Sequence, residues 1–217
     1  PDLFDPKAQP VAKPVTKIAT VPKPIMCNTA ELLLEDSYSN GKHAQDWFRI
    51  TGKFEVVGDQ LKCAELETDK QHSELSTGTT GPLKANDLVI QFSFKLDGAR
   101  MLGIGLENTS GHVARAIATP DGFEILKWSG QKDTMSVKFK RGTWHNALVE
   151  IRGSEMVAQI DDQPPLYIKD NGLLAEKPRL VLINYGRYAW FDNLKVWKAD
   201  ANESWSTNRE RDSRRRK

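Results

Sequence analysis

The chain has 217 residues, a formal net charge of +2 and 39% hydrophobic residues. Its last ten residues hold six Arg or Lys against two acidic residues, so the rest of the chain nets about −2, which argues against a nucleic-acid-binding surface. No apolar run approaches the ~20 residues needed to span a bilayer. A chain of this length suits one domain with a sizeable core and flanking tails.

The two ends differ in composition from the middle. Residues 1–26 hold six of the eleven prolines, and proline fixes φ and removes an amide donor. We therefore predict an extended Pro/Lys-rich linker over residues 1–31 and a folded domain over residues 32–198. We predict a polar, basic tail over residues 199–217, in which Trp205 packs back on the domain. Because the chain begins with Pro1 instead of Met, we expect that an N-terminal segment has been removed or left out, and we expect a secreted or periplasmic location.

Short alternating segments, bounded by Gly, Asp and Asn, follow one another along the chain. The first predicted strands are residues 32–36, 47–50, 54–57, 60–65 and 74–77. The central stretch from Asn86 to Trp128 then predicts a four-strand antiparallel meander. Its strands are residues 88–96, 101–106, 112–118 and 123–128, with turns at residues 97–100, 108–111 and 120–122. The remaining predicted strands are residues 136–139, 147–152, 156–161, 166–169, 180–185 and 189–198.

The alternation indicates which faces are buried. In residues 88–96 every second residue is apolar, which is typical of a half-buried strand. The last strand is ambiguous, because Trp190, Leu194 and Val196 fall on one face while Phe191, Lys195 and Trp197 fall on the other. Many short strands without a helical period predict an all-β fold, a two-sheet antiparallel sandwich.

Four segments also carry a resemblance to a known family. They are Trp47 with residues 54–61, and then residues 144–153, 157–163 and 191–197. Over residues 32 to about 198 the chain resembles the concanavalin A-like jelly-roll family named for 3-keto-disaccharide hydrolase, although Gln163 stands where that family often has Gly. The resemblance implies a jelly roll that handles carbohydrate, and as one activity the hydrolysis of 3-keto-glycosides.

The acidic motif of glycosidases is incomplete in this chain. Retaining glycosidases on such sandwiches commonly carry Glu-x-Asp-x-x-Glu on one strand, because residues two apart share a face. The nearest fragment is Glu67-Thr68-Asp69, which lacks the final Glu and is more simply a solvated loop. A glycan-binding module is therefore favoured. A hydrolase acting on 3-keto-glycosides stays open, because elimination from a 3-keto-sugar needs only one base.

The candidate ligand groove lies beside the meander. Asn108, His112, Arg115 and Trp128 are its candidate binding residues, because hydroxyls bond to polar side chains and sugars stack on aromatic faces. His112 is also the candidate catalytic base, since imidazole titrates near neutral pH. The alternatives are a turn residue for His112 and a core position for Trp128. His43 and His145 are expected to be structural.

The sequence gives few signs of a metal, a cofactor or a disulfide. No His or Cys spacing marks a metal site, so no cofactor is expected, while the sequence leaves a structural calcium open. Carbohydrate is the expected partner, with no nucleic acid and no membrane span. A bridge between Cys27 and Cys63 would add about 4 kcal/mol in the chain-entropy model, but two unpaired thiols are favoured because neither spacing nor count requires a bridge.

Overall fold

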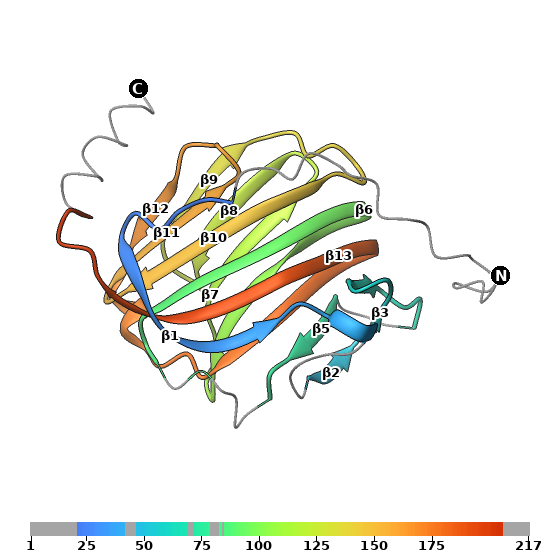
Figure 1. Ribbon diagram of the computed structural model, residues 1–217, viewed down its shortest axis with the longest axis horizontal. Coiled ribbons are helices and arrows are strands. Elements are labelled where there is room, and N and C mark those ends of the chain that lie inside the picture. The colour runs from blue at the N-terminus through green and yellow to red at the C-terminus, as the bar shows by residue number, and fades with distance from the viewer. Residues whose placement is uncertain (1–20, 42–46, 69–71, 79–82, 84, 206–217) are drawn as a thin grey trace.

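The computed structural model describes residues 21–41, 47–68, 72–78, 83 and 85–205 (Figure 1). Within these ranges the strands are β1 (Cys27–Asp36), β2 (Phe48–Thr51), β3 (Lys53–Val56), β4 (Leu61–Ala64), β5 (Ser73–Ser76), β6 (Leu88–Asn108), β7 (Gly111–Thr119), β8 (Gly122–Lys127), β9 (Lys132–Ser136), β10 (Trp144–Arg152), β11 (Glu155–Ile160), β12 (Leu166–Lys169) and β13 (Arg179–Ala201). The helical turns are η1 (Ser39–Gly41) and η2 (Asn171–Leu174). No helix in the described ranges is long and apolar enough to cross a membrane.

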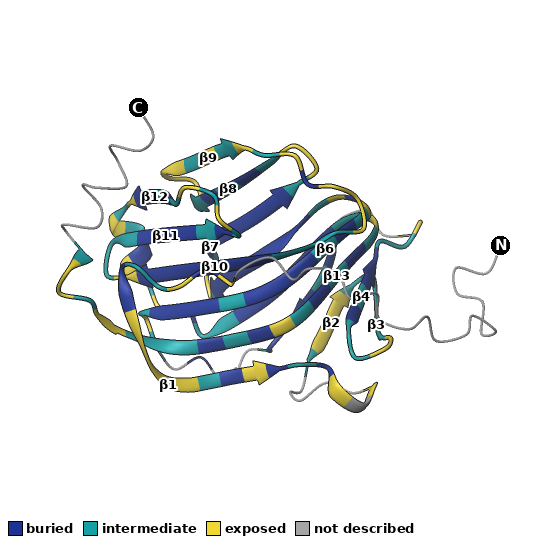
Figure 2. Cartoon of the chain, turned by 45° about the horizontal axis from the view of Figure 1, so that its top comes forward, coloured by how far each residue is buried: buried dark blue, intermediate teal, exposed yellow. Residues whose placement is uncertain are grey.

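The strands form an all-β, two-layer antiparallel jelly-roll sandwich, as the sequence predicted (Figure 1, Figure 2). The first layer runs β12-β11-β10-β6-β13, and β1, β4 and β3 continue it beyond β13. The second layer runs β9-β8-β7-β6-β13-β5-β2. Strands β6 and β13 belong to both layers, so the hydrogen bonds join the two layers into one continuous sheet.

The predicted turn at residues 97–100 is wrong, because β6 passes through it without a break. Gly98 has φ +101°, and Tyr188 of β13 pairs with both Asp97 and Gly98. β13 likewise runs through Gly186, also at φ +101°, where two separate strands were predicted. A glycine in a strand pattern can mark a bulge as well as a turn. These two glycines lie where both strands pass from one layer to the other.

One predicted strand is displaced. β9 spans residues 132–136, and the predicted strand at 136–139 leaves the ladder after its first residue. The amides of Val137 and Phe139 donate instead to the carbonyls of Asp121 and Pro120, at 3.3 and 3.0 Å. The alternation of this segment therefore reflects packing of Phe139 against the core and not strand pairing.

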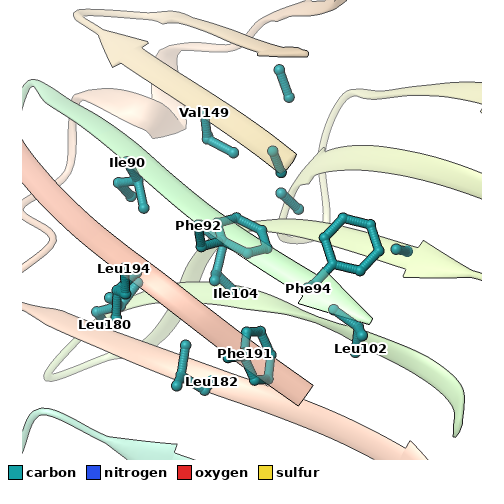
Figure 3. Packing of buried hydrophobic residues seen from close by; sticks show 14 of the residues in the cluster. Ile90, Phe92, Phe94, Leu102, Ile104, Val149, Leu180, Leu182, Phe191 and Leu194 are labelled. Carbon is teal, nitrogen blue, oxygen red and sulfur yellow. The ribbon is translucent and has the colours of Figure 1, made fainter. Parts of the chain in front are cut away.

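Apolar side chains of the two layers meet between them (Figure 3). Phe92 and Phe94 from the first half of β6 face Leu102 and Ile104 from its second half. The ring centroids of Phe92 and Phe191 are 6.1 Å apart. Each such buried side chain contributes roughly 1.5–3 kcal/mol of transfer free energy, so this interior is the main source of stability.

A bulge in β13 resolves the ambiguous last strand. The register shifts between Asp192 and Lys195, and Asn193 lies at φ +51°. After the shift, Phe191 and Leu194 both face the core and are fully buried. Trp190 points to the opposite, outer face. The predicted grouping of Trp190 with Leu194 is therefore wrong, because it assumed an unbroken period of two.

The folded unit begins before the predicted boundary at Leu32. The backbone amides of Ile25, Met26 and Cys27 donate to the Glu150 carboxylate at 3.0, 2.9 and 2.7 Å. Burial raises the pKa of Glu150, and these three amides oppose that rise. A segment held by its backbone on one buried carboxylate has no periodic signature, and residues 28–32 of β1 are all exposed and do not alternate, which explains why the sequence indicated a linker up to residue 31.

The folded unit also extends past residue 198. β13 continues to Ala201, and the Trp205 ring lies 6.1 Å from that of Tyr167. The Trp205 indole donates to Glu155 at 3.3 Å. Trp205 therefore packs on the domain, as the sequence predicted. The rest of the predicted tail, residues 206–217, and the first twenty residues of the predicted linker lie outside the described residues.

The two cysteines are free and buried, the alternative that the sequence favoured. Cys27 pairs opposite Ala201 of β13, and Cys63 pairs opposite Ala189 of the same strand. Twelve strand residues span roughly 40 Å, whereas a disulfide needs Cα atoms within about 7 Å. Burial raises the pKa of both thiols, so neither is activated as a nucleophile.

The bend in β13 can be tested at Gly186. A Cβ there would lie 3.0 Å from the Arg100 amide nitrogen, on a backbone that already has φ +101°. Gly111 has a similar φ of +112° but open space around it. We expect Gly186→Ala to lower the free energy of unfolding more than Gly111→Ala, by roughly 1–3 kcal/mol in urea denaturation. Equal losses would show that the crowding at the bend is relieved without cost.

Candidate functional site

The predicted groove residues lie on the outer face of the second layer. Gly105 of β6 pairs with Arg115 of β7, and Glu107 pairs with His112. Leu106, between the two β6 residues, points into the core. Because side chains alternate across a strand, Arg115, His112 and Glu107 all face away from the core. The sheet register thus gathers polar groups over β6 and β7.

A β-bulge places His112 on the same face as Arg115. Residues three apart on a regular strand point to opposite faces. The register between β6 and β7 shifts at Glu107, so that Val113 is an extra residue on β7. Such a bulge re-aims the side chains next to it. His112 is thereby turned toward Arg115.

His112 lies between an acidic and a basic side chain. Its Nδ1 is in close contact with Oε1 of Glu107, and Nη2 of Arg115 donates to its Nε2 at 2.9 Å. Arg179 Nη2 lies 3.5 Å from the other Glu107 oxygen. Glu107 and Arg115 are buried, and hydrogen bonds that involve a charged group are stronger in such surroundings. These contacts fix the plane of the imidazole.

Trp128, directly after β8, packs against the same two side chains. Its ring centroid is 4.6 Å from that of His112 in an edge contact, and Arg115 Cζ lies 4.7 Å from the Trp128 ring. Its amide donates to the Val113 carbonyl at 2.9 Å. Trp128 is nevertheless 41% exposed, so it is a surface residue and not part of the core. The indole is held in place while still open to solvent.

Two further residues of the site were missed in the sequence, Glu74 of β5 and His72 just before it. His72 Nε2 is in close contact with Glu74 Oε1, and Arg115 Nη2 lies 4.0 Å from the same oxygen. The hydrogen bond from His72 lowers the pKa of Glu74, and the charges of His72, Arg115 and His112 add to it, while burial opposes it. Burial lowers the pKa of Arg115.

The Arg115 side chain passes beside Gly105 of β6 on its way to Glu74. A Cβ added at Gly105 would lie 3.8 Å from Arg115 Cγ, an ordinary contact distance, and 3.3 Å from Ile183 Cδ1. No local signal ties β5 to β7, because the two strands are separated by β6 and β13 in the sheet. This explains why Glu74 was not found from the sequence.

Asn108 belongs to the turn beside the site and not to the polar cluster. Its Oδ1 accepts from the Ser110 amide at 2.8 Å, and its backbone carbonyl accepts from Arg179. This is an Asx turn, a common use of Asn between strands. The structure thus brings His112, Arg115 and Trp128 together and leaves the Asn108 side chain occupied by its own turn.

The remaining candidates contribute nothing to the cluster. Glu67 lies exposed in the turn after β4, and Asp69 and His43 lie outside the described residues. His145 Nδ1 bonds to Asp161 at 2.7 Å and its ring packs 4.7 Å from that of Phe139, which makes it structural. Among the described residues, no group of three or more His, Cys, Asp or Glu is arranged to hold a metal ion.

No protein-family model matches this chain, and no curated protein sequence matches it. Its fold is similar to that of a Bacillus subtilis protein of unknown function with a galectin-like fold (TM-score 0.62, 10% identity, 82% of this chain and 100% of that one). It is also similar to SCLam, a non-specific endo-beta-1,3(4)-glucanase from family GH16 (TM-score 0.61, 10% identity, 84% and 96%). A sialidase matches with TM-score 0.61 and 13% identity over 83% of this chain, which spans only 20% of the sialidase. At these identities the likeness establishes the jelly-roll fold alone.

The ion pair of Glu74 predicts a pH dependence. Because its pKa is below the ordinary value of 4.5, Glu74 contributes stability that is present above that value and is lost as the pH falls through the lower, folded-state value. We expect Glu74→Gln to cost about 1–2 kcal/mol near pH 7, a typical loss for a charge-assisted hydrogen bond. The difference from wild type should shrink as the pH falls below 4.5 and through the lower, folded-state pKa, as measured by urea denaturation across pH.

The matched control is Glu67→Gln, at an exposed turn position. It removes one carboxylate without touching the cluster and should leave the acid limb of the stability curve unchanged. A Glu74→Gln variant as stable as wild type at neutral pH would contradict the ion-pair assignment.

Proposed function

We propose that this protein is an exported carbohydrate-binding β-sandwich module that holds its ligand against Trp128. One observation carries the proposal, namely an indole that is 41% exposed and is fixed on the sheet by Arg115 and His112. The apolar face of a sugar ring stacks on an aromatic ring of this kind. The binding face is the outer face of the second layer.

The polar groups around Trp128 suit the hydroxyls of a sugar. Arg115 supplies guanidinium donors, and Glu107 and Glu74 supply carboxylate acceptors in the same cluster. Carbohydrate sites combine a few oriented polar groups with an apolar platform. Because these side chains already bond to one another, little conformational entropy would be lost when a ligand binds.

Structural likeness supports the same class of function without establishing it. The similar structures include a module titled carbohydrate binding module CBM66 from Bacillus subtilis, with TM-score 0.52 and 13% identity over 73% of this chain and 98% of that one. They also include the GH16 glucanase described above. One fold supports many functions, so the assignment depends on the site and not on the likeness.

The platform is tested by Trp128→Ala. A glycan array on the wild-type protein identifies a ligand, and calorimetry then compares affinities. We expect Trp128→Ala to weaken binding roughly tenfold or more, because the stacking surface is removed, while the melting temperature changes by only a few degrees.

Phe48→Ala is the control for this experiment. Phe48 is 58% exposed on β2, at the opposite edge of the same layer, and its removal should leave the affinity unchanged. Undiminished binding by Trp128→Ala, at full stability, would place the ligand elsewhere. Absence of any glycan ligand for the wild-type protein would refute the proposed function.

A second candidate function is cleavage of 3-keto-glycosides by elimination. The close contact between Glu107 and His112 favours it, because a carboxylate that orients an imidazole is a common arrangement for a general base. Such a base would remove a proton from C2, next to the ketone. The electron pair would form the C1–C2 double bond and expel the glycosidic oxygen, which takes up a proton and leaves as the alcohol, and water would then add to the enone. Against this role, Nε2 of His112 accepts from Arg115, so both ring nitrogens are engaged.

This engagement leads to a kinetic prediction. We expect the wild-type protein to leave a 3-keto-glucoside intact, as followed by release of the aglycone. Measured cleavage that falls about 100-fold in His112→Ala would instead establish the hydrolase and its base. Cleavage that survives the substitution would remove His112 from that role.

A further inference from the structure

A second cluster of exposed-face side chains lies on the first layer, away from the Trp128 site. Lys62 of β4 pairs opposite Trp190 of β13, and Trp190 pairs opposite Lys95 of β6. Lys95 in turn pairs opposite Trp144 of β10. Directly opposite residues share one face of a sheet. Lysine and tryptophan therefore alternate in one row across four neighbouring strands.

This lysine–aromatic row, made of Lys62, Trp190, Lys95 and Trp144 with Tyr188 beside it, faces solvent. The β13 neighbours of Trp190, Ala189 and Phe191, are fully buried in the core, so Trp190 points outward. All five members of the row are half-buried, with part of each side chain open.

Each ammonium group in the row lies over two aromatic rings. Lys95 Nζ is 4.3 Å from the ring centroid of Trp190 and 4.9 Å from that of Trp144. Lys62 Nζ is 4.1 Å from that of Tyr188 and 5.3 Å from that of Trp190. These cation–π contacts hold the two ammonium groups against the aromatic rings. Flexible lysines are thereby preorganised, which lowers the entropic cost of binding an anion.

The electrostatics of the row favour an anionic ligand. Burial lowers the pKa of both amines, and the charge of Lys62 lowers the pKa of Lys95 further, while the nearby Asp97 carboxylate opposes the shift in both. The carboxylates at the flanks have other cationic partners, Glu55 with Lys53 at 2.8 Å and Asp97 with Arg141 at 3.0 Å. An external carboxylate or sulfate would thus add favourable charge between two neighbouring amines.

We propose that the lysine–aromatic row is a second binding site, for a segment of an acidic polysaccharide. The acidic groups pair with Lys62 and Lys95, and the sugar rings pack on the parts of Trp144 and Trp190 that these ammonium groups leave open. Two strand spacings separate the lysines by about 10 Å, close to the length of two sugar units in an extended chain. The site is separate from the one assigned above, since it lies on the other layer.

A single-stranded nucleic acid is the competing ligand, because it also uses aromatic platforms and cations. Its phosphate chain needs a continuous positive groove. The last ten residues carry a net charge of +4 and the whole chain carries +2, so the rest of the chain carries a net charge of −2. Glu55 and Asp97 also place negative charge on both sides of the row. A polymer with one acidic group every one or two sugars matches two lysines better.

The test measures binding of the full chain to polygalacturonate, with dextran as the neutral polymer, by affinity electrophoresis and calorimetry. We expect Lys62→Gln with Lys95→Gln to weaken polygalacturonate binding at least about tenfold. The matched control is Lys132→Gln with Lys169→Gln, which removes the same charge from two exposed positions on β9 and β12. It should leave the affinity within about twofold.

A footprint on the wild-type protein gives a readout that does not depend on any variant folding. Polygalacturonate should slow acetylation of Lys62 and Lys95 and leave Lys132 unaffected. Equal weakening by both double variants, or uniform protection of all lysines, would overturn the proposal in favour of nonspecific charge attraction. Tighter binding of an oligothymidylate at the same lysines would overturn it in favour of nucleic acid.

Trp128→Ala separates this site from the proposed function. It should leave polygalacturonate binding unchanged while it weakens binding of the glycan found on the array roughly tenfold or more. Loss of both activities in Trp128→Ala would mean a single site and would refute the second one.

Discussion

The antiparallel pairing of β6 with β13 is the constraint on which the rest of the structure depends. These strands pair along nearly their whole length and run through both layers, with a glycine at φ +101° in each at the passage. β10 and β7 attach to the two halves of β6, and β1, β4 and β5 attach to β13. Both layers therefore share one register, and an error at the bend would displace the core and both outer faces together.

The sequence predicted the fold class because alternation is a local property. Residues 88–96 alternate so regularly that their inner face was assigned correctly, and the Phe92 and Phe94 side chains lie in the core. The turn predicted at residues 97–100 was wrong for the opposite reason, because the structure there is not decided locally. The Asp97-Gly98 pair suits a hairpin turn and a bulge equally, and what decides between them is Tyr188, ninety residues further along the chain. Local sequence cannot contain that information.

In the candidate site too, local features could be predicted from the sequence and long-range contacts could not. His112, Arg115 and Trp128 could be placed close together from the sequence because they lie on β7 and at the end of β8, two strands joined by one short turn. Glu74 and His72 come from β5, which reaches the cluster only through its pairing with β13. The bulge at Val113 was also invisible, although without it His112 would face the core. Site residues that lie close together in sequence could be predicted, whereas residues that strand pairing brings in from distant parts of the chain could not.

The two outer faces are chemically different although one core supports both. Inward positions of every long strand must be apolar, so their composition is fixed by packing. Outward positions that stay open to solvent carry no such requirement, and a residue there is selected by its cross-strand neighbours, whereas Val89, Leu148 and Val157 of the first layer are buried in a second apolar cluster with Met26 and Cys27. On the second layer these neighbours pair cations with carboxylates around Trp128, whereas on the first layer they alternate lysines with aromatic rings. Because each set is confined to its own face, either can change without disturbing the interior, and a single sandwich can present two unlike surfaces.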